Sequence, residues 1–412
     1  MDRTNIAMAV PGIRAELGLT TAQIGFATGC FFWGYIILQI PVGRIATLWS
    51  AKQVIGILVV LWSVVSMTTA LVQTEWQLIL NRLVLGLTEG GVLTAVMVLN
   101  RAWFSRGERA KAVTLFLSSI AVAPAIANPI AGVVLSYVDW RWMFVVEGLP
   151  GLLWAAVWWW AVADSPAKAR WLPEAERGRI QASLEAEPVA VPIQGHWSRT
   201  LVQPSVLLLT LYNFFALAAE YSVIFWMPSV LQDTGLAIGA IGFLSAVPYL
   251  AGTVAMVVVG LNSDRFQERK WHMIACTVLS GLFLVLGQVS VAGPWQAWYI
   301  LALLTLSNAV FFSRYGPFWA LPAEVLPVSV FGVGIVLING AGNLGGFFGP
   351  FLAGYLRDQT GSFSVALALA GVALIGSGLV ALPLRIVNAR PRGDVVAESA
   401  APARANLPER HS

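Results

Sequence analysis

The chain has 412 residues, of which 58% are hydrophobic and only 11% are charged. An average soluble domain carries roughly 25% charged residues, so a soluble fold of this length could not cover its surface with so few charges. Lipid is therefore the expected solvent for much of the chain, and a formal charge of only +4 argues against a nucleic-acid partner.

Apolar runs of about 20 residues, the length that crosses a bilayer as a helix, recur along the chain. The first run is short and reads as the second half of a helix, so we expect the natural reading frame to extend upstream by roughly 20–25 residues. The sequence therefore predicts an all-α membrane protein of about twelve spans, the first of them truncated. Full-length candidates follow at 24–43, 54–73, 78–99, 112–137, 143–163, 204–231, 236–261, 272–293, 296–321, 328–355 and 363–386.

Most lysines and arginines lie in the loops on one side of these spans and in the C-terminal tail. The opposite loops hold only Arg14, Arg141 and Arg357. Positive residues favour the cytoplasmic side, so we expect a multi-pass protein of the inner cell membrane with a cytoplasmic C-terminus.

The longest polar segment, 164–203, divides the chain into two parts of similar length. The predicted domains are an N-terminal six-helix half at 1–163, this segment as a cytoplasmic linker, and a C-terminal six-helix half at 204–386. The remaining residues, 387–412, are rich in Ala, Pro and Arg, which is typical of a disordered cytoplasmic tail.

Two loops at equivalent places in the halves share a pattern. The loop at 43–52 follows the second span and the loop at 260–270 follows the eighth. Each begins with a glycine at the end of a helix and ends with a lysine. Such repetition is typical of transporters built from two parallel repeats.

The second of these loops resembles the Gly-x-x-x-Asp-Arg motif of the major facilitator superfamily, with Gly260, Asp264 and Arg265 at the motif positions. In the first loop Thr47 stands where the family usually has Asp, which predicts a weaker gating lock in the N-terminal half. Further stretches resemble the anion:cation symporter branch, which includes bacterial carriers of sugar acids and vesicular carriers of glutamate and sialic acid. These stretches are Asp2-Arg3-Thr4-Asn5-Ile6, Arg82 to Gly91, Trp140-Arg141-Trp142-Met143-Phe144, Glu147-Gly148-Leu149-Pro150, Ser263-Asp264-Arg265 and Asn339 to Phe347.

We expect a monomer that works by alternating access, with substrate between the halves at the bilayer midplane. The resemblance implies a fold of two six-helix bundles. It also implies roles for charges inside the spans. Arg3 and Arg82 correspond to substrate-binding positions, and Asp2 and Glu89 to proton-coupling positions.

The residues themselves support a site at this depth. At ~1.5 Å of helix rise per residue, Asp2 lies ~17 Å and Glu89 ~20 Å from the outer ends of their spans. A charge at the bilayer centre costs at least ~2.5–3.5 kcal/mol, so it needs a partner or a water-filled cavity. Arginine suits a carboxylate ligand, and a carboxyl group in such surroundings can exchange a proton near neutral pH. The alternative is that these residues form structural ion pairs between helices.

Other polar and aromatic residues in the spans carry weaker predictions. Glu220 is either a second proton site or the partner of an arginine, and Arg314 is an inner gate or a cation that snorkels to the interface. Glu147 is expected to be structural. The resemblance implies substrate contacts for Tyr35, Trp319 and Asn339, whereas packing is the alternative for the two aromatic residues. Gly342, Gly345 and Gly346 predict close helix packing.

These observations favour a proton-coupled symporter of a small organic anion, with a sugar acid or a related carboxylate as the leading class. A facilitator or exchanger of aromatic or dicarboxylic acids, without proton coupling, is the alternative within transport. An integral membrane enzyme would need a nucleophile–base pair or a metal cluster, and the sequence offers neither, nor any cofactor motif. A sensor should carry a folded soluble domain, for which the longest loop is too short.

Overall fold

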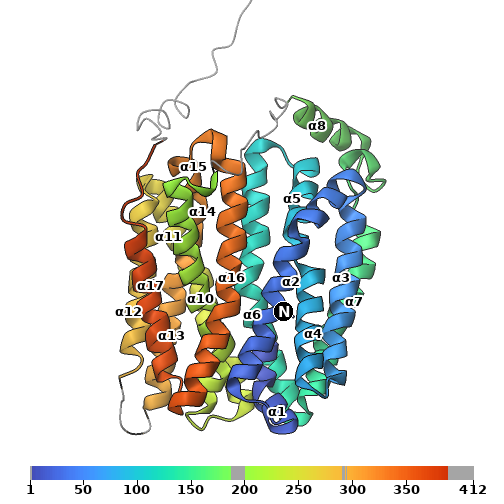
Figure 1. Ribbon diagram of the computed structural model, residues 1–412. Helices are drawn as coiled ribbons and strands as arrows, with labels where there is room; N and C mark the ends of the chain where they lie inside the picture. Colours follow the sequence, from blue (N-terminus) through green and yellow to red (C-terminus); the bar gives the residue numbers. More distant parts are fainter. Residues whose placement is uncertain (1, 187–199, 290–292, 294, 388–412) are drawn as a thin grey trace, which may run out of the picture.

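The computed structural model describes residues 2–186, 200–289, 293 and 295–387. Within these residues the chain is helical, with no strand (Figure 1). Among the described residues, nine helices are long and apolar enough to cross a membrane, and two further apolar helices are slightly shorter. The predicted all-α membrane fold is confirmed. The tail at 388–412 lies outside the described residues.

The N-terminal half forms one bundle, shown in blue to green in Figure 1. Its first helix is short, as predicted, and runs from mid-height to the lower face of the figure. The helices are α1 (Ile6–Leu17), α2 (Thr21–Leu48), α3 (Ala51–Thr68), η1 (Thr69–Leu71), α4 (Glu75–Glu89), α5 (Val92–Trp103), α6 (Arg106–Tyr137) and α7 (Trp140–Ala161).

Two short helices in the predicted linker, η2 (Pro166–Lys168) and α8 (Glu174–Glu185), lie at the upper face of Figure 1. The C-terminal half then forms the second bundle. Its helices are α10 (Pro204–Gln232), α11 (Ile238–Phe266), α12 (Lys270–Leu286), α13 (Gln296–Ser313), α14 (Tyr315–Ala320), α15 (Pro322–Val325), α16 (Val328–Thr360) and α17 (Ser364–Val380).

Two of the predicted spans are broken, and each break lies next to a charged residue. The predicted span at 78–99 is α4 and α5, separated by Gly90 and Gly91 directly after Glu89. The span at 296–321 is interrupted at Arg314, between α13 and α14. Pro317 explains the second break, because a proline clashes with the carbonyl group four residues earlier, here that of Ser313.

Glycines at the first break, and another glycine in the C-terminal half, allow helices to approach closely. A methyl group on Gly86 would overlap the carbonyl group of Phe31, and one on Gly90 would overlap that of Tyr35. The backbone of α4 therefore lies directly against α2. In the C-terminal half, Gly345 lies in the same way against the carbonyl group of Phe214 on α10, which confirms the close packing predicted there.

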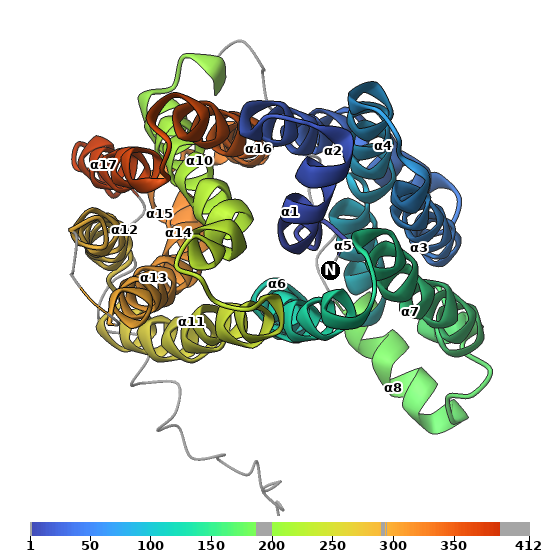
Figure 2. The same cartoon turned by 90° about the horizontal axis from the view of Figure 1, so that it is seen from below.

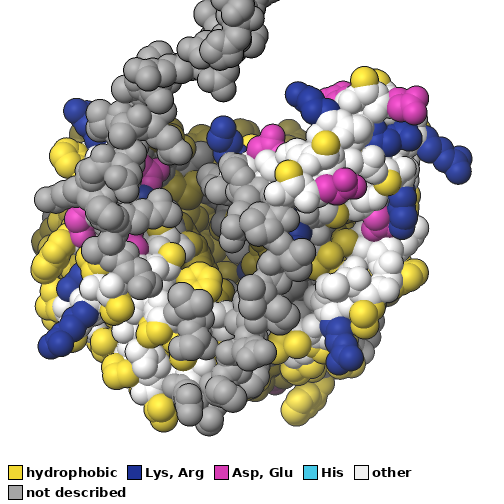
Figure 3. Space-filling model, turned by 90° about the horizontal axis from the view of Figure 1, so that it is seen from above, with side chains coloured by type: hydrophobic (Ala, Val, Ile, Leu, Met, Phe, Trp, Pro, Cys, Tyr) yellow, Lys and Arg dark blue, Asp and Glu magenta, His cyan; other side chains and the backbone are white. Residues whose placement is uncertain are grey.

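The two halves meet at the lower face of Figure 1. The Asp358 carboxylate at the end of α16 accepts hydrogen bonds from the backbone N–H groups of Thr21 (3.1 Å) and Ala22 (2.7 Å) at the start of α2. Gly132 of α6 and Gly242 of α11 also leave no room for a side chain between those helices. Seen from the upper face, the surface is hollowed between the halves (Figure 3).

We expect Gly86→Val to destabilise the protein by ~1–3 kcal/mol or more, because the added methyl groups force α4 away from α2. Thermal unfolding of the purified protein in detergent would measure the change. Gly376→Ala is the matched control, because nothing lies within 4 Å of a methyl group at that position of α17. A Gly86→Val variant as stable as this control would contradict the close contact of α2 with α4.

Candidate functional site

A cavity of about 290 Å³ lies between the two halves. Figure 2 shows α1 on the inner side of the N-terminal half, beside α10 of the other half. The predicted site residues that line the cavity are Asp2, Arg3, Tyr35, Glu89 and Glu220. Residues from both halves therefore form its walls.

Arg3 is the residue that joins the walls of this cavity. Its Nη2 atom lies 3.4 Å from Oε2 of Glu89 on α4, and its Nη1 atom donates to the Tyr221 hydroxyl group on α10 at 3.2 Å. The guanidinium also lies over the rings of Phe31 and Tyr35 on α2, at 4.9 and 4.6 Å from their centroids. With 29% of its side chain exposed, Arg3 remains accessible from the cavity.

Glu89 is placed by the end of its own helix. It is the last residue of α4, and the two glycines that follow bring it against α2 beside Tyr35. Its carboxylate is 15% exposed and has Arg3 as its ion-pair partner. A carboxylate that has one ion-pair partner and borders a cavity can take up a proton, and protonation then ends the ion pair.

Asp2 and Arg82 have other hydrogen-bond partners. One Asp2 carboxylate oxygen accepts from the Ser66 hydroxyl group on α3 at 2.9 Å. Arg82 is 1% exposed and donates to Thr69 at 2.7 Å and to Asn81 at 3.2 Å. Arg82 borders a space of only about 10 Å³ that Arg3 also lines, and it does not line the larger cavity.

A second buried charge cluster lies in the C-terminal half. The Glu220 carboxylate on α10 accepts from the Tyr315 hydroxyl group at 2.8 and 3.0 Å, and Nη2 of Arg314 lies 3.7 Å from its Oε2 atom. The Arg314 side chain is fully buried. The interpretation that Arg314 snorkels to the interface is therefore wrong. It is the predicted arginine partner of Glu220, although that pairing does not test a proton-carrying role for Glu220.

Four aromatic rings surround the Arg314 guanidinium at 4.2–5.7 Å from their centroids, those of Phe311, Tyr315, Phe318 and Tyr212. Such rings attract a cation through their negative faces. Arg314 therefore lies inside the C-terminal half and does not line the cavity between the halves.

The other predicted contacts lie outside the cavity. Trp319 packs against Phe318, with ring centroids 4.9 Å apart. Asn339 accepts hydrogen bonds from the Asn343 amide, at its backbone oxygen (2.8 Å) and its side-chain oxygen (3.3 Å). Glu147 is buried in α7, 6% exposed.

The loop motif of the C-terminal half lies at the upper face. Asp264 pairs with Arg269 at 2.5 Å, and Arg269 also lies 3.9 Å from Glu324 on α15. Arg265 lies over the Phe266 ring, and Gly260 has open space beside it. Through Arg269, the motif thus ties the end of α11 to α15.

The corresponding loop of the N-terminal half is tied differently. There Asp164 accepts from the Ser50 hydroxyl group at 2.8 Å and from the Lys52 backbone at 3.0 Å. The lysine that ends each loop binds carbonyl oxygens near the end of the last helix of its half. Lys52 binds that of Trp159 in the last turn of α7, and Lys270 binds those of Leu382 and Leu384 just after α17. This equivalence supports the predicted internal repeat.

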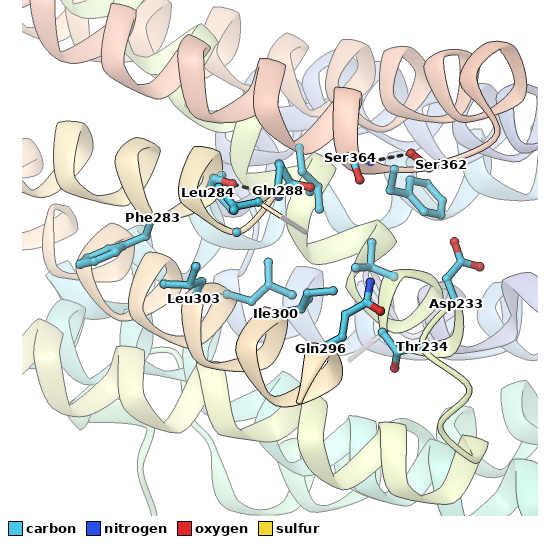
Figure 4. A pocket seen from close by; sticks show the side chains of 16 residues that line it. Asp233, Thr234, Phe283, Leu284, Gln288, Gln296, Ile300, Leu303, Ser362 and Ser364 are labelled. Carbon is cyan, nitrogen blue, oxygen red and sulfur yellow. Dashed lines mark hydrogen bonds between the residues drawn. The ribbon is translucent and has the colours of Figure 1, made fainter. Parts of the chain in front are cut away.

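A separate cavity of about 200 Å³ lies within the C-terminal half near the lower face (Figure 4). Asp233, Thr234 and Gln296 lie toward one end of it, and Leu303 and Phe283 toward the other. It contains none of the predicted site residues.

Sequence reasoning did not single out Tyr221, which binds Arg3, or Tyr315, which binds Glu220. Each follows a charged residue of the site directly in sequence, and neighbours in a helix point about 100° apart. The sequence signal for these two tyrosines was their position next to an intramembrane charge. That position does not show which partner the hydroxyl group reaches.

The amino-acid sequence has relatives that carry organic acids. A relative in Agrobacterium vitis named "Putative tartrate transporter" is 30% identical over 391 residues, which cover 93% of this chain and 86% of that protein. The D-galactonate transporter of Escherichia coli is 25% identical, over 92% of this chain and 90% of its own. Both fit the anion:cation symporter branch that the motifs predict.

The fold has solved counterparts as well. The crystal structure of a D-xylose-proton symporter superposes with a TM-score of 0.75 at 15% identity, covering 93% of this chain and 94% of the other. The family model of the Major Facilitator Superfamily matches residues 1–350 and, in a second match, residues 209–408. The matched family and the similar proteins are transporters and not enzymes. The chain is a multi-pass membrane transporter that belongs to the major facilitator superfamily.

Proposed function

We propose that this transporter carries a small organic anion, a sugar acid or a related carboxylate, together with a proton. The upper face of Figure 1 would be cytoplasmic, with the C-terminus on the same side, and the protein would work as a monomer in the inner membrane. Relatives named for tartrate and D-galactonate support the substrate class.

The observation that carries the proposal is the position of Arg3 between Glu89 and Tyr221. One guanidinium group has partners in both halves and remains partly exposed to the cavity. Arginine presents a planar fork of donors that matches a carboxylate. A substrate carboxylate that enters the cavity therefore has this cation as a partner on the cavity wall.

Glu89 couples the binding of the anion at Arg3 to the binding of a proton. While Glu89 is ionised, its carboxylate neutralises Arg3 and competes with the substrate for the same donors. When Glu89 takes up a proton, Arg3 is left without its counter-ion and a substrate carboxylate can replace it. Because proton and anion arrive together, the charge in the cavity stays balanced, and the affinity for the anion should rise as pH falls from neutral.

Uptake into proteoliposomes tests the proposal directly. We expect labelled D-galactonate or tartrate to accumulate when the proton gradient is directed with the substrate, and to stop accumulating when an ionophore collapses that gradient. Transport that only equilibrates the anion, unchanged by the gradient, would favour the facilitator or exchanger instead.

Glu89→Gln should abolish accumulation against a gradient while substrate exchange across the membrane continues, because the amide cannot carry the proton. Counterflow and uphill uptake, measured on the same vesicles, separate the two activities. Glu185→Gln, which removes an exposed carboxylate from α8, is the matched control. Normal uphill uptake by Glu89→Gln would mean that Glu89 serves only as a structural partner.

Arg3→Lys should weaken substrate binding about 10-fold or more, or ~1.4 kcal/mol, because lysine keeps the charge but loses the paired donors. Isothermal titration of the purified protein measures the change, with the exposed Arg170→Lys as control. If a well-folded Arg3→Lys variant binds as tightly as the unmodified protein, Arg3 does not contact the substrate.

A further inference from the structure

We infer that Glu220 is a second recognition group of the cavity, which accepts hydrogen bonds from the hydroxyl groups of a hydroxy acid whose carboxylate lies at Arg3. The inference rests on the proposed function, because it assumes an organic anion at Arg3. It adds the chemical feature that distinguishes the preferred acids from plain carboxylates.

Glu220 has unused capacity to accept hydrogen bonds. A carboxylate offers about four acceptor positions on its two oxygens. The single hydroxyl hydrogen of Tyr315 is shared between those oxygens, and Arg314 at 3.7 Å is beyond hydrogen-bond distance. The side chain is 3% exposed, and it lines the cavity between the halves. A ligand hydroxyl group in the cavity would meet an acceptor that protein donors do not saturate.

Arg314 and Tyr315 serve as positioning residues for this acceptor. A carboxylate at this depth needs a counter-charge, and Arg314 supplies it from inside a ring of aromatic side chains. The Arg314 guanidinium is fully buried away from the cavity, so it compensates the charge of Glu220 without offering a competing anion site. Tyr315 fixes the direction of the carboxylate.

The two recognition groups belong to opposite halves of the protein. Arg3 lies with the N-terminal half, beside α2 and α4, and Glu220 lies on α10 next to Tyr221, which binds Arg3. The cavity of about 290 Å³ is at the lower end of the range for ligand pockets, so a small molecule can touch both walls. A molecule with a carboxylate at one end and hydroxyl groups along its chain matches this distribution of one cation and one acceptor.

Three six-carbon acids test the assignment: D-galactonate with hydroxyl groups, hexanoate without them, and 6-aminohexanoate with a terminal ammonium group. Their affinities are measured by isothermal titration with the purified full chain. We expect D-galactonate to bind more tightly than hexanoate, and Glu220→Gln to reduce this preference about 10-fold or more, since hydrogen bonds to a charged acceptor are among the stronger ones. Tyr315→Phe, which keeps the ring but removes the donor to Glu220, should reduce the preference in the same direction.

The controls separate recognition from damage to the fold. Tyr299→Phe removes a hydroxyl group from α13 that binds the Leu286 carbonyl outside the cavity, and it should leave the preference unchanged. Arg3→Lys should weaken D-galactonate and hexanoate to similar degrees. The affinity ratio is informative even if a variant loses stability, because both ligands are measured on the same protein.

The outcomes separate this inference from the proposed function. If no acid binds the unmodified protein, the proposed function fails. If the acids bind and Glu220→Gln keeps the preference for D-galactonate, the role of Glu220 is overturned while the anion site at Arg3 stands. A preference for 6-aminohexanoate that Glu220→Gln removes would assign Glu220 to an ammonium group and also overturn the inference.

Discussion

The structure depends on the need to compensate charges that lie deep in a low-dielectric bundle. Each unpaired charge at mid-depth costs at least ~2.5–3.5 kcal/mol, and the chain places several there. Arg3 meets this need by drawing partners from α2, α4 and α10 to one point. Those partners belong to both halves. The contacts that compensate the charge of Arg3 therefore also connect the halves across the cavity.

Two interrupted helices make this arrangement possible. α4 ends at Glu89 and α13 ends just before Arg314, so one charged residue of each half lies where a helix is broken. The glycines beside Glu89 let α4 approach the backbone of α2, and Pro317 interrupts the ladder of α13. The halves thus carry comparable charge pairs, Arg3 with Glu89 and Arg314 with Glu220, but only the first has its cation exposed to the cavity.

Much of the architecture could be predicted from the sequence, because spans depend on long apolar runs that a single chain displays openly. Every predicted span corresponds to a helix or to a helix pair. Glu89, which the motif singled out as a site residue, lines the cavity between the halves. Apart from an arginine partner for Glu220, the side-chain pairing could not be predicted. The Arg82 side chain donates hydrogen bonds to Thr69 and Asn81 inside the bundle. The Arg314 side chain lies in an aromatic cluster and does not reach the membrane interface. Helix rotation and neighbours distant in sequence decide such directions, and hydropathy does not report them. The tyrosines at 221 and 315 were missed for the same reason.

The most direct test of the account is the number of protons taken up when the anion binds. Titrating D-galactonate into the purified protein in buffers of different ionisation enthalpy measures it without any transport step. Exchange of the Glu89 carboxylate for a substrate carboxylate at Arg3 predicts net proton uptake on binding, absent in Glu89→Gln although that variant still binds. Binding without proton uptake, or uptake that persists in Glu89→Gln, would contradict the account.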